Sequence, residues 1–173
     1  MASGDTLTIW TGGACAGPPG YGYGGWAWLA VQGGTARGAA GGERHTTAGA
    51  MALRAMVEAL KAVAAEPSAP LRLDPGDPVL ARTAADLAAR QAAGWRNAGG
   101  GPMENPELWV QVAAAVGART GPVRFVAAAG TDARTFVDAW TAFARDKCRD
   151  KGPFTSAIPR PNLQTFMTKR ASA

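Results

Sequence analysis

The chain has 173 residues, of which 47% are hydrophobic and 18% charged, and its formal net charge is +5. This length suits a single domain with its own core, and no segment approaches the ~20 apolar residues of a membrane span. The opening MASGDTLTIW lacks the basic and apolar regions of a signal peptide. Two cysteines fit a reducing compartment. We therefore expect a cytoplasmic protein without a membrane partner.

The charge is distributed unevenly along the chain. Residues 1–143 carry 11 basic and 11 acidic side chains, whereas residues 144–173 carry seven basic and two acidic ones. Proteins that bind nucleic acid gather lysine and arginine where they meet phosphate. Attraction to phosphate is therefore expected mainly from the C-terminal segment, although a solvated, partly disordered tail would have the same composition.

Hydrophobic spacing predicts three strands and a helix in the first part of the chain. TLTIW (6–10) alternates polar and apolar residues, GWAWLAVQ (25–32) continues as a second strand, and the glycine-rich stretch 33–45 holds a weakly marked third. TTAGAMALRAMVEALKAVAAE (46–66) begins at a threonine cap and repeats apolar residues at helical spacing. Three antiparallel strands followed by a helix are expected.

The remaining elements alternate short strands with helices. Strands are predicted at 71–74 and 122–129, and helices at 77–95, 105–118 and 132–148. This order predicts an α/β fold, with a five-stranded mixed sheet and helices on both of its faces.

Five short motifs, in order along the chain, resemble ribonuclease H. They are IWTGGACAGPPGYGYGGWAWL, TTAGAMAL, LRLDPGDPVL, AGWRNAGGGPMENPELW and FVAAAGTDARTFVDAWTAFA. In that family they correspond to the strand with TDG, the TTNNRMEL helix start, the strand ending in TDS, the GW and N-x-x-LW passage, and the D-x-L-A segment. The resemblance implies a ribonuclease H-like domain over 1–148, followed by a basic, proline-containing tail over 149–173.

The same resemblance assigns the positions of the family's four metal-binding carboxylates. They fall on Gly12, Ala52, Gly76 and Asp138, and only Asp138 keeps a carboxylate. Glycine and alanine offer Mg²⁺ no side-chain oxygen, and one carboxylate cannot organise two ions ~3.5–4 Å apart. We therefore expect a pseudoenzyme with no assignable catalytic residue, no metal site and no cofactor. Mg²⁺ would be needed only if residual nuclease activity existed.

Neighbouring acids offer an alternative, an active Mg²⁺-dependent enzyme with rearranged ligands. Asp74 precedes the family position Gly76 by two residues, which places it about 6–7 Å away along the strand. Asp77 is next to Gly76 in the sequence, where neighbouring strand side chains point to opposite faces. Glu58 lies six residues after Ala52 and therefore faces largely away from it on the predicted helix. Asp132 could approach Asp138.

Binding of nucleic acid would use the residues that remain near the family's groove. The turn TTAGAM has lost the family's amides and its basic residue. The candidates that remain are Arg90, Trp95, Arg96 and Asn97 in one loop and Arg145, Lys147, Arg149 and Lys151 in the basic C-terminal segment. Trp95 fits a core anchor of the loop equally well.

Three functions follow from these residues. The first is a catalytically degenerate ribonuclease H-like protein that binds an RNA–DNA hybrid, another nucleic acid or a protein partner weakly. The second is the active enzyme with rearranged ligands, which cleaves RNA in RNA–DNA hybrids. The third is a protein-interaction domain without nucleic acid, with exposed aromatic residues such as Tyr21, Tyr23, Trp26 or Trp28 as its patch.

Overall fold

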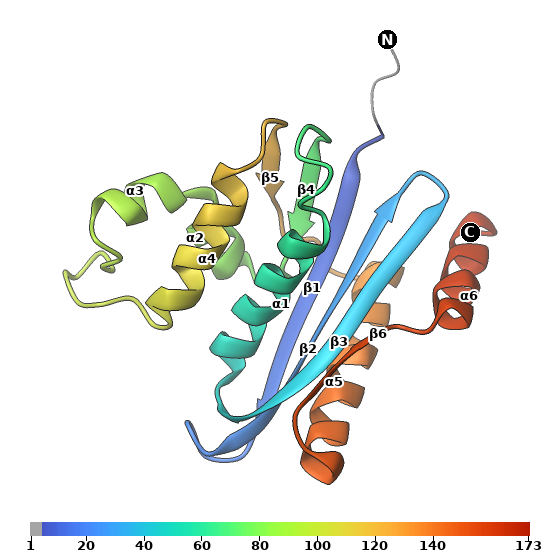
Figure 1. Cartoon of the computed structure of the whole chain (residues 1–173), viewed down its shortest axis with the longest axis horizontal. Coiled ribbons are helices and arrows are strands. Elements are labelled where there is room, and N and C mark those ends of the chain that lie inside the picture. Colours follow the sequence, from blue (N-terminus) through green and yellow to red (C-terminus); the bar gives the residue numbers. More distant parts are fainter. Residues whose placement is uncertain (1–4) are drawn as a thin grey trace.

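The computed structural model describes residues 5–173, which form a mixed six-stranded sheet of order β5-β4-β1-β2-β3-β6 (Figure 1). The three long strands are antiparallel neighbours: β1 (Leu7–Ala16), β2 (Gly22–Gln32) and β3 (Thr35–Thr46). The short strands extend both edges: β4 (Leu71–Asp74) and β5 (Val123–Phe125) run parallel to β1, and β6 (Phe154–Ala157) is antiparallel to β3.

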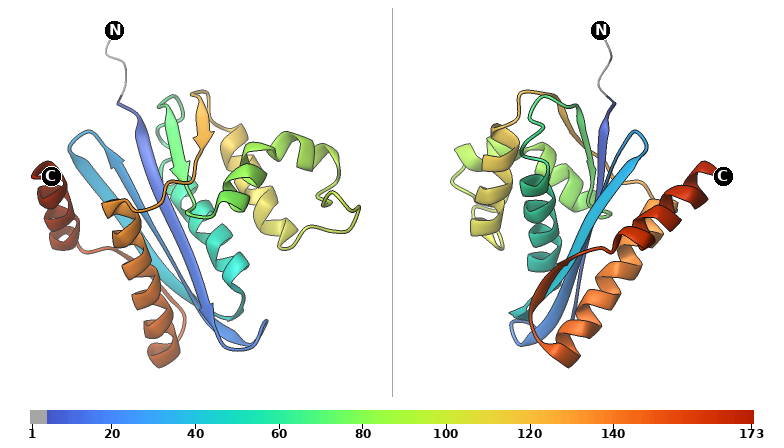
Figure 2. Two further views of the ribbon diagram at one scale, coloured as in Figure 1. Left: turned by 180° about the vertical axis from the view of Figure 1, so that it is seen from behind. Right: turned by 45° about the vertical axis from the view of Figure 1, so that its right-hand side comes forward.

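The helices cover both faces of the sheet (Figure 2). One face carries α1 (Ala48–Ala62), α2 (Pro78–Ala85), α3 (Leu87–Ala92) and α4 (Pro106–Gly117). The other carries α5 (Asp132–Lys151), and α6 (Arg160–Ala171) lies near the β3 and β6 edge. The predicted class, an α/β fold with a mixed sheet between helices, is confirmed.

The predicted number of five strands is wrong, because β6 adds a sixth. Its four residues are mostly exposed and show no apolar alternation, so no periodic signal marks them as a strand. Pairing with Ala39–Gly42 of β3 creates the strand instead.

Two apolar clusters lie on opposite sides of the sheet. Successive strand residues point to opposite faces, so Ile9 packs with the α1 and α4 cluster and Trp10 with the α5 and α6 cluster. Leu29 is fully buried on the α5 side and Leu73 on the α1 side. The long strands are apolar on both faces because helices cover both.

Residues 149–173, expected as a tail, lie along the domain. They complete α5, form β6 and end in α6, whose Leu163 and Phe166 are buried with Ile158 in the α5 cluster. The basic residues of this segment are therefore carried on ordered elements. Among the described residues, no helix is both long and apolar enough to cross a membrane.

Candidate functional site

A cavity of about 560 Å³ opens where the end of β1, the first turns of α1, the loop after β4 and the middle of α5 meet. Its lining contains all four positions that the family resemblance singles out, Gly12, Ala52, Gly76 and Asp138. Chain segments far apart in sequence therefore bring these positions to one place. Most of the lining is small, which exposes backbone to the cavity.

The side chains in this cavity do not fit a pair of Mg²⁺ ions. Asp138 is the one carboxylate among the four positions, its side chain is 62% exposed, and it pairs with Arg134 at 3.4 Å. Within residues 5–173, no three histidine, cysteine, aspartate or glutamate side chains are grouped so that they could hold a metal ion. Hard cations need several oxygen ligands, so the donor set of the family is incomplete.

Asp74 is the best candidate to replace a missing ligand at Gly76, but its carboxylate oxygens already accept hydrogen bonds from the protein. The carboxylate is buried and accepts hydrogen bonds from the backbone N–H of Gly76 at 2.8 Å and of Ala128 at 3.1 Å. It also accepts from Nη2 of Arg134 at 3.2 Å. These contacts tie the loop after β4 to the segment before α5.

The other three candidate acids, Asp77, Asp132 and Glu58, make contacts elsewhere in the fold. Asp77 caps α2 by accepting from the N–H of Val79 at 2.7 Å, although it also borders the cavity. Asp132 lies 3.6 Å from Arg170, and Glu58 pairs with basic residues of its own helix. Neither Asp132 nor Glu58 lines the cavity.

Arg134 is a residue of the cavity that the sequence motifs did not single out. It precedes Asp138 by four residues on α5, so both lie on one face of the helix. Its guanidinium donates to the backbone oxygens of Thr11 at 2.7 Å and Asp74 at 2.8 Å, besides the two carboxylates. The i, i+4 spacing was visible in the sequence, but the strand partners were not.

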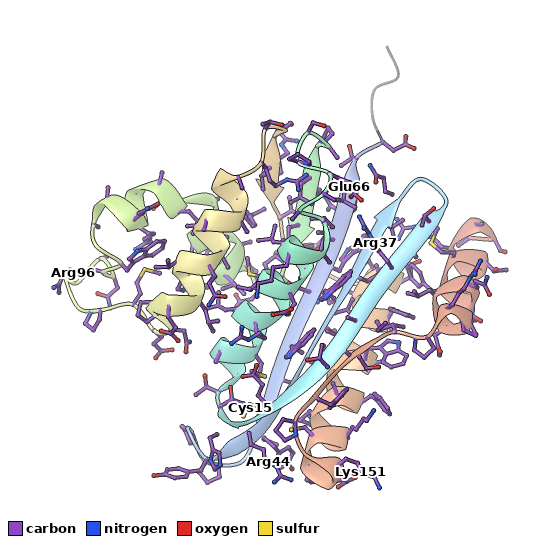
Figure 3. All side chains as sticks on the ribbon, viewed as in Figure 1. Cys15, Arg37, Arg44, Glu66, Arg96 and Lys151 are labelled. Carbon is purple, nitrogen blue, oxygen red and sulfur yellow. The ribbon has the colours of Figure 1, made fainter. Side chains whose placement is uncertain are left out.

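The predicted nucleic-acid contacts fall into two groups on different sides of the molecule. Figure 3 shows Arg96 at the outer loop beyond α3 and Lys151 at the far end of α5. In the loop, Trp95 packs against the α1 and α4 cluster, and Arg96 donates to the carbonyl of Gly100 at 2.9 Å. Asn97 accepts from the N–H of Gly101, and Arg90 pairs with Asp86 on α3. These loop residues therefore hold the loop itself.

The second group lies on the C-terminal half of α5. Arg145 lines the cavity, while the ammonium of Lys147 lies 4.4 Å from the ring centre of Phe154. The hydrogen bond from Arg149 to Asp150 raises the pKa of the arginine and lowers that of the aspartate. Lys151 is exposed at the end of the helix.

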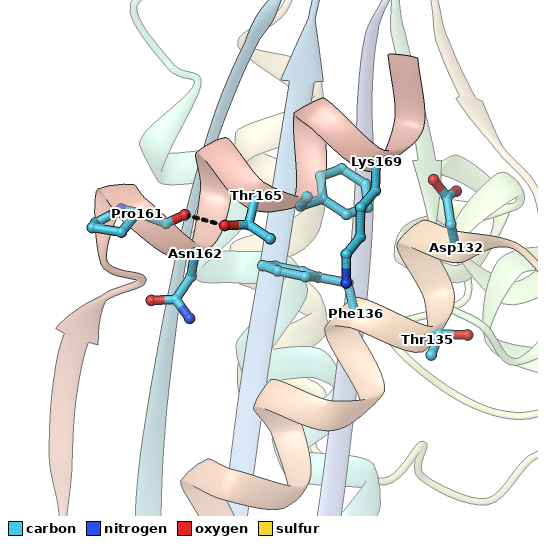
Figure 4. A pocket seen from close by; sticks show the side chains of 8 residues that line it. Asp132, Thr135, Phe136, Pro161, Asn162, Thr165 and Lys169 are labelled. Atoms are coloured by element: carbon cyan, nitrogen blue, oxygen red, sulfur yellow. Dashed lines mark hydrogen bonds between the residues drawn. The ribbon is translucent and has the colours of Figure 1, made fainter. Parts of the chain in front are cut away.

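A second cavity, of about 530 Å³, lies between α5 and α6 (Figure 4). Its lining includes the apolar side chains of Phe136 and Phe166 and the charged side chains of Asp132 and Lys169. Of the residues considered as possible ligands in the sequence, only Asp132 lines it, and it lies opposite Lys169 rather than beside the four family positions.

Comparison with solved structures defines the class of the domain. LC9-RNase H1, a type 1 RNase H with the type 2 active-site motif, matches with a TM-score of 0.72 over 94% of this chain and 81% of its own, at 19% identity. LC11-RNase H1 in complex with an RNA/DNA hybrid matches with a TM-score of 0.61 over 83% of this chain and 99% of its own, at 17% identity. The fold is therefore that of a ribonuclease H-like domain.

Sequence relatives identify the family within that class. Ribonuclease H of Polaromonas naphthalenivorans (strain CJ2) is 39% identical over 103 residues, which span 60% of this chain and 62% of the relative. Ribonuclease H of Pseudomonas entomophila (strain L48) is 37% identical over 106 residues, 61% of this chain and 70% of the relative. No family model matches the chain. This chain belongs to the ribonuclease H family.

The family corrects one expectation. From the sequence we expected a protein that is not an enzyme, because three carboxylates are missing. That expectation is wrong, because the relatives are named for an enzyme, ribonuclease H. The missing carboxylates concern only the four family positions, and their absence does not determine the activity of the whole chain.

Proposed function

We propose that this chain acts on RNA–DNA hybrids and holds them across the cavity between β1, α1 and α5. The observation that carries the proposal is the convergence of the four family positions with Arg145 in one open cavity. A solved relative of the same fold is a complex with an RNA/DNA hybrid. Family membership and fold therefore point to the same ligand class.

The start of α1 supplies a second feature suited to phosphate. Thr47 caps this helix through a hydrogen bond from the N–H of Ala50, and the first turn contains no acidic residue. Ala48 and Gly49 line the cavity at that end of the helix. The positive end of the helix dipole attracts anions, and small side chains let a phosphate approach the backbone.

The residues that line the cavity do not provide the ligands for the Mg²⁺ ions of the family. Mg²⁺ is the ion that the family resemblance implies, but Gly12, Ala52 and Gly76 offer it no side-chain oxygen. Asp138 is paired with Arg134 and largely exposed. The residues of the cavity support hybrid binding.

Binding by this face should be weak and sensitive to salt. The two basic residues that line the cavity are both paired with acids, Arg145 with Asp146 and Arg134 with Asp74 and Asp138, which leaves little free positive charge there. We expect a dissociation constant on the order of the 10⁻⁴–10⁻⁶ M of non-specific complexes.

Fluorescence anisotropy of a labelled RNA–DNA hybrid at several salt concentrations tests this. The variant Arg145→Gln should lower the slope of log affinity against log salt by about 1, because each phosphate contact contributes about 0.9. Arg124→Gln, which removes an exposed charge on edge strand β5, is the matched control and should leave the slope unchanged.

The same samples separate the outcomes. An unchanged slope in Arg145→Gln, with binding intact, contradicts the proposed face. Gel analysis of the RNA strand after incubation with Mg²⁺ or Mn²⁺ distinguishes a member of the family that cleaves the hybrid from one that binds it.

A further inference from the structure

Arg134 lines the cavity, and its guanidinium contacts four oxygen atoms. Its guanidinium contacts the backbone oxygens of Thr11 and Asp74 and one carboxylate oxygen each of Asp74 and Asp138, at 2.7 to 3.4 Å. Its side chain is 13% exposed, and that of Asp74 is fully buried. Carbonyl and carboxylate oxygens are the ligands of hard cations, so these four atoms form a cation site whose occupant is an arginine.

The glycines that replace family carboxylates leave room for this arginine. A Cβ on Gly76 would lie 2.9 Å from Cζ of Arg134, and Gly76 has a φ of +80°, which disfavours other residues. A Cβ on Gly12 would lie 2.8 Å from Oγ1 of Thr141 and 3.7 Å from Nη1 of Arg134. A carboxylate at Gly76 would overlap the guanidinium, and one at Gly12 would crowd the α5 side chains beside it.

We infer that Arg134 is the resident cation of this site and takes the place of a bound metal ion. The guanidinium neutralises the buried Asp74 and the neighbouring Asp138, and it joins β1, the end of β4 and α5 through its four contacts. The fold of this chain therefore needs no divalent ion to offset these carboxylates. The inference concerns the side chains of the cavity alone and does not depend on the proposed ligand.

Thermal unfolding of the full chain with EDTA or millimolar Mg²⁺ tests the inference. The Tm of the wild type should be the same in both. Arg134→Ala leaves a buried carboxylate without its partner, and its Tm in EDTA should fall by roughly 10 °C. The emptied oxygen cage should then accept Mg²⁺, which should raise the Tm of this variant but not that of the wild type.

Two further variants keep the test decisive. Arg134→Lys retains the charge without the forked geometry, so its Tm should lie between those of the wild type and Arg134→Ala. Arg124→Gln should match the wild type with and without Mg²⁺. If Arg134→Ala does not fold, an intermediate and Mg²⁺-independent Arg134→Lys still supports the inference.

A wild type whose Tm rises with Mg²⁺, or an Arg134→Ala variant as stable as the wild type, would overturn the inference. So would an Arg134→Lys variant equal to the wild type. Because these samples contain no nucleic acid, their failure would leave the proposed hybrid binding untouched.

Discussion

A chain that ends at Gly152 is expected to lose several kcal/mol of folding stability. The deletion removes β6 and α6 and with them the buried side chains of Ile158, Leu163 and Phe166. Burying one such side chain is worth about 1.5–3 kcal/mol, and the whole fold is stabilised by only about 5–15 kcal/mol. The deletion also uncovers the edge of β3 and the neighbours of these residues in the α5 cluster.

Urea unfolding of the two chains, followed by circular dichroism, measures the loss. The full-length variant Arg160→Gln, Lys169→Gln is the control, because it removes exposed charges of the segment and leaves its packing intact. It should unfold like the wild type. A truncated chain with the midpoint of the full chain would show that the segment contributes no packing energy.

Gly13→Ala should be the most damaging single methyl group on β1. A Cβ at this position would lie 2.2 Å from the backbone nitrogen of Ala52 and 2.5 Å from the carbonyl carbon of Met51. Overpacking costs about 1–3 kcal/mol, and the upper end applies because the obstacle is the backbone of α1 and cannot rotate away. The Tm should fall by roughly 10 °C.

Gly34→Ala is the matched control for this substitution. The added methyl group meets nothing within 4 Å in the turn between β2 and β3, so the Tm should stay close to that of the wild type. Differential scanning calorimetry of the three proteins decides the point. Equal Tm values for Gly13→Ala and Gly34→Ala would contradict the close approach of β1 and α1.

The elements with strong local signals were predictable from the sequence. Helix α1 begins after Thr47, as the threonine cap and the apolar spacing indicate, and its inner face buries Met51, Met56 and Leu60. Strand β4 spans Leu71–Asp74, the predicted range. In both cases the periodicity of the chain and its capping residues agree with the tertiary structure.

The C-terminal elements were not predictable, because their signals are tertiary. Pro159 and Pro161 suggest a broken tail, but Pro161 lies in the first turn of α6, where a missing N–H costs nothing. Only Leu163 and Phe166 of this helix are buried, which is too few for a clear apolar stripe.

The candidate site also has a part that was predictable from the sequence and a part that was not. The order of the sequence motifs was enough to group Gly12, Ala52, Gly76 and Asp138, and these four residues line one cavity. The ion pair of Arg134 with Asp74 joins residues 60 positions apart, and no local pattern announces it. Its recognition required the register of β1 against β4 and the path of α5.

Backbone NMR of the labelled chain titrated with an RNA–DNA hybrid tests the central claim most directly. We expect the amide signals of Gly12, Gly49, Gly76 and Arg145 to shift together as the cavity face meets the hybrid. Shifts confined to the Arg96 loop or to α6, or no shift at hybrid concentrations that saturate the anisotropy signal, would contradict the assignment of this cavity as the hybrid-binding face.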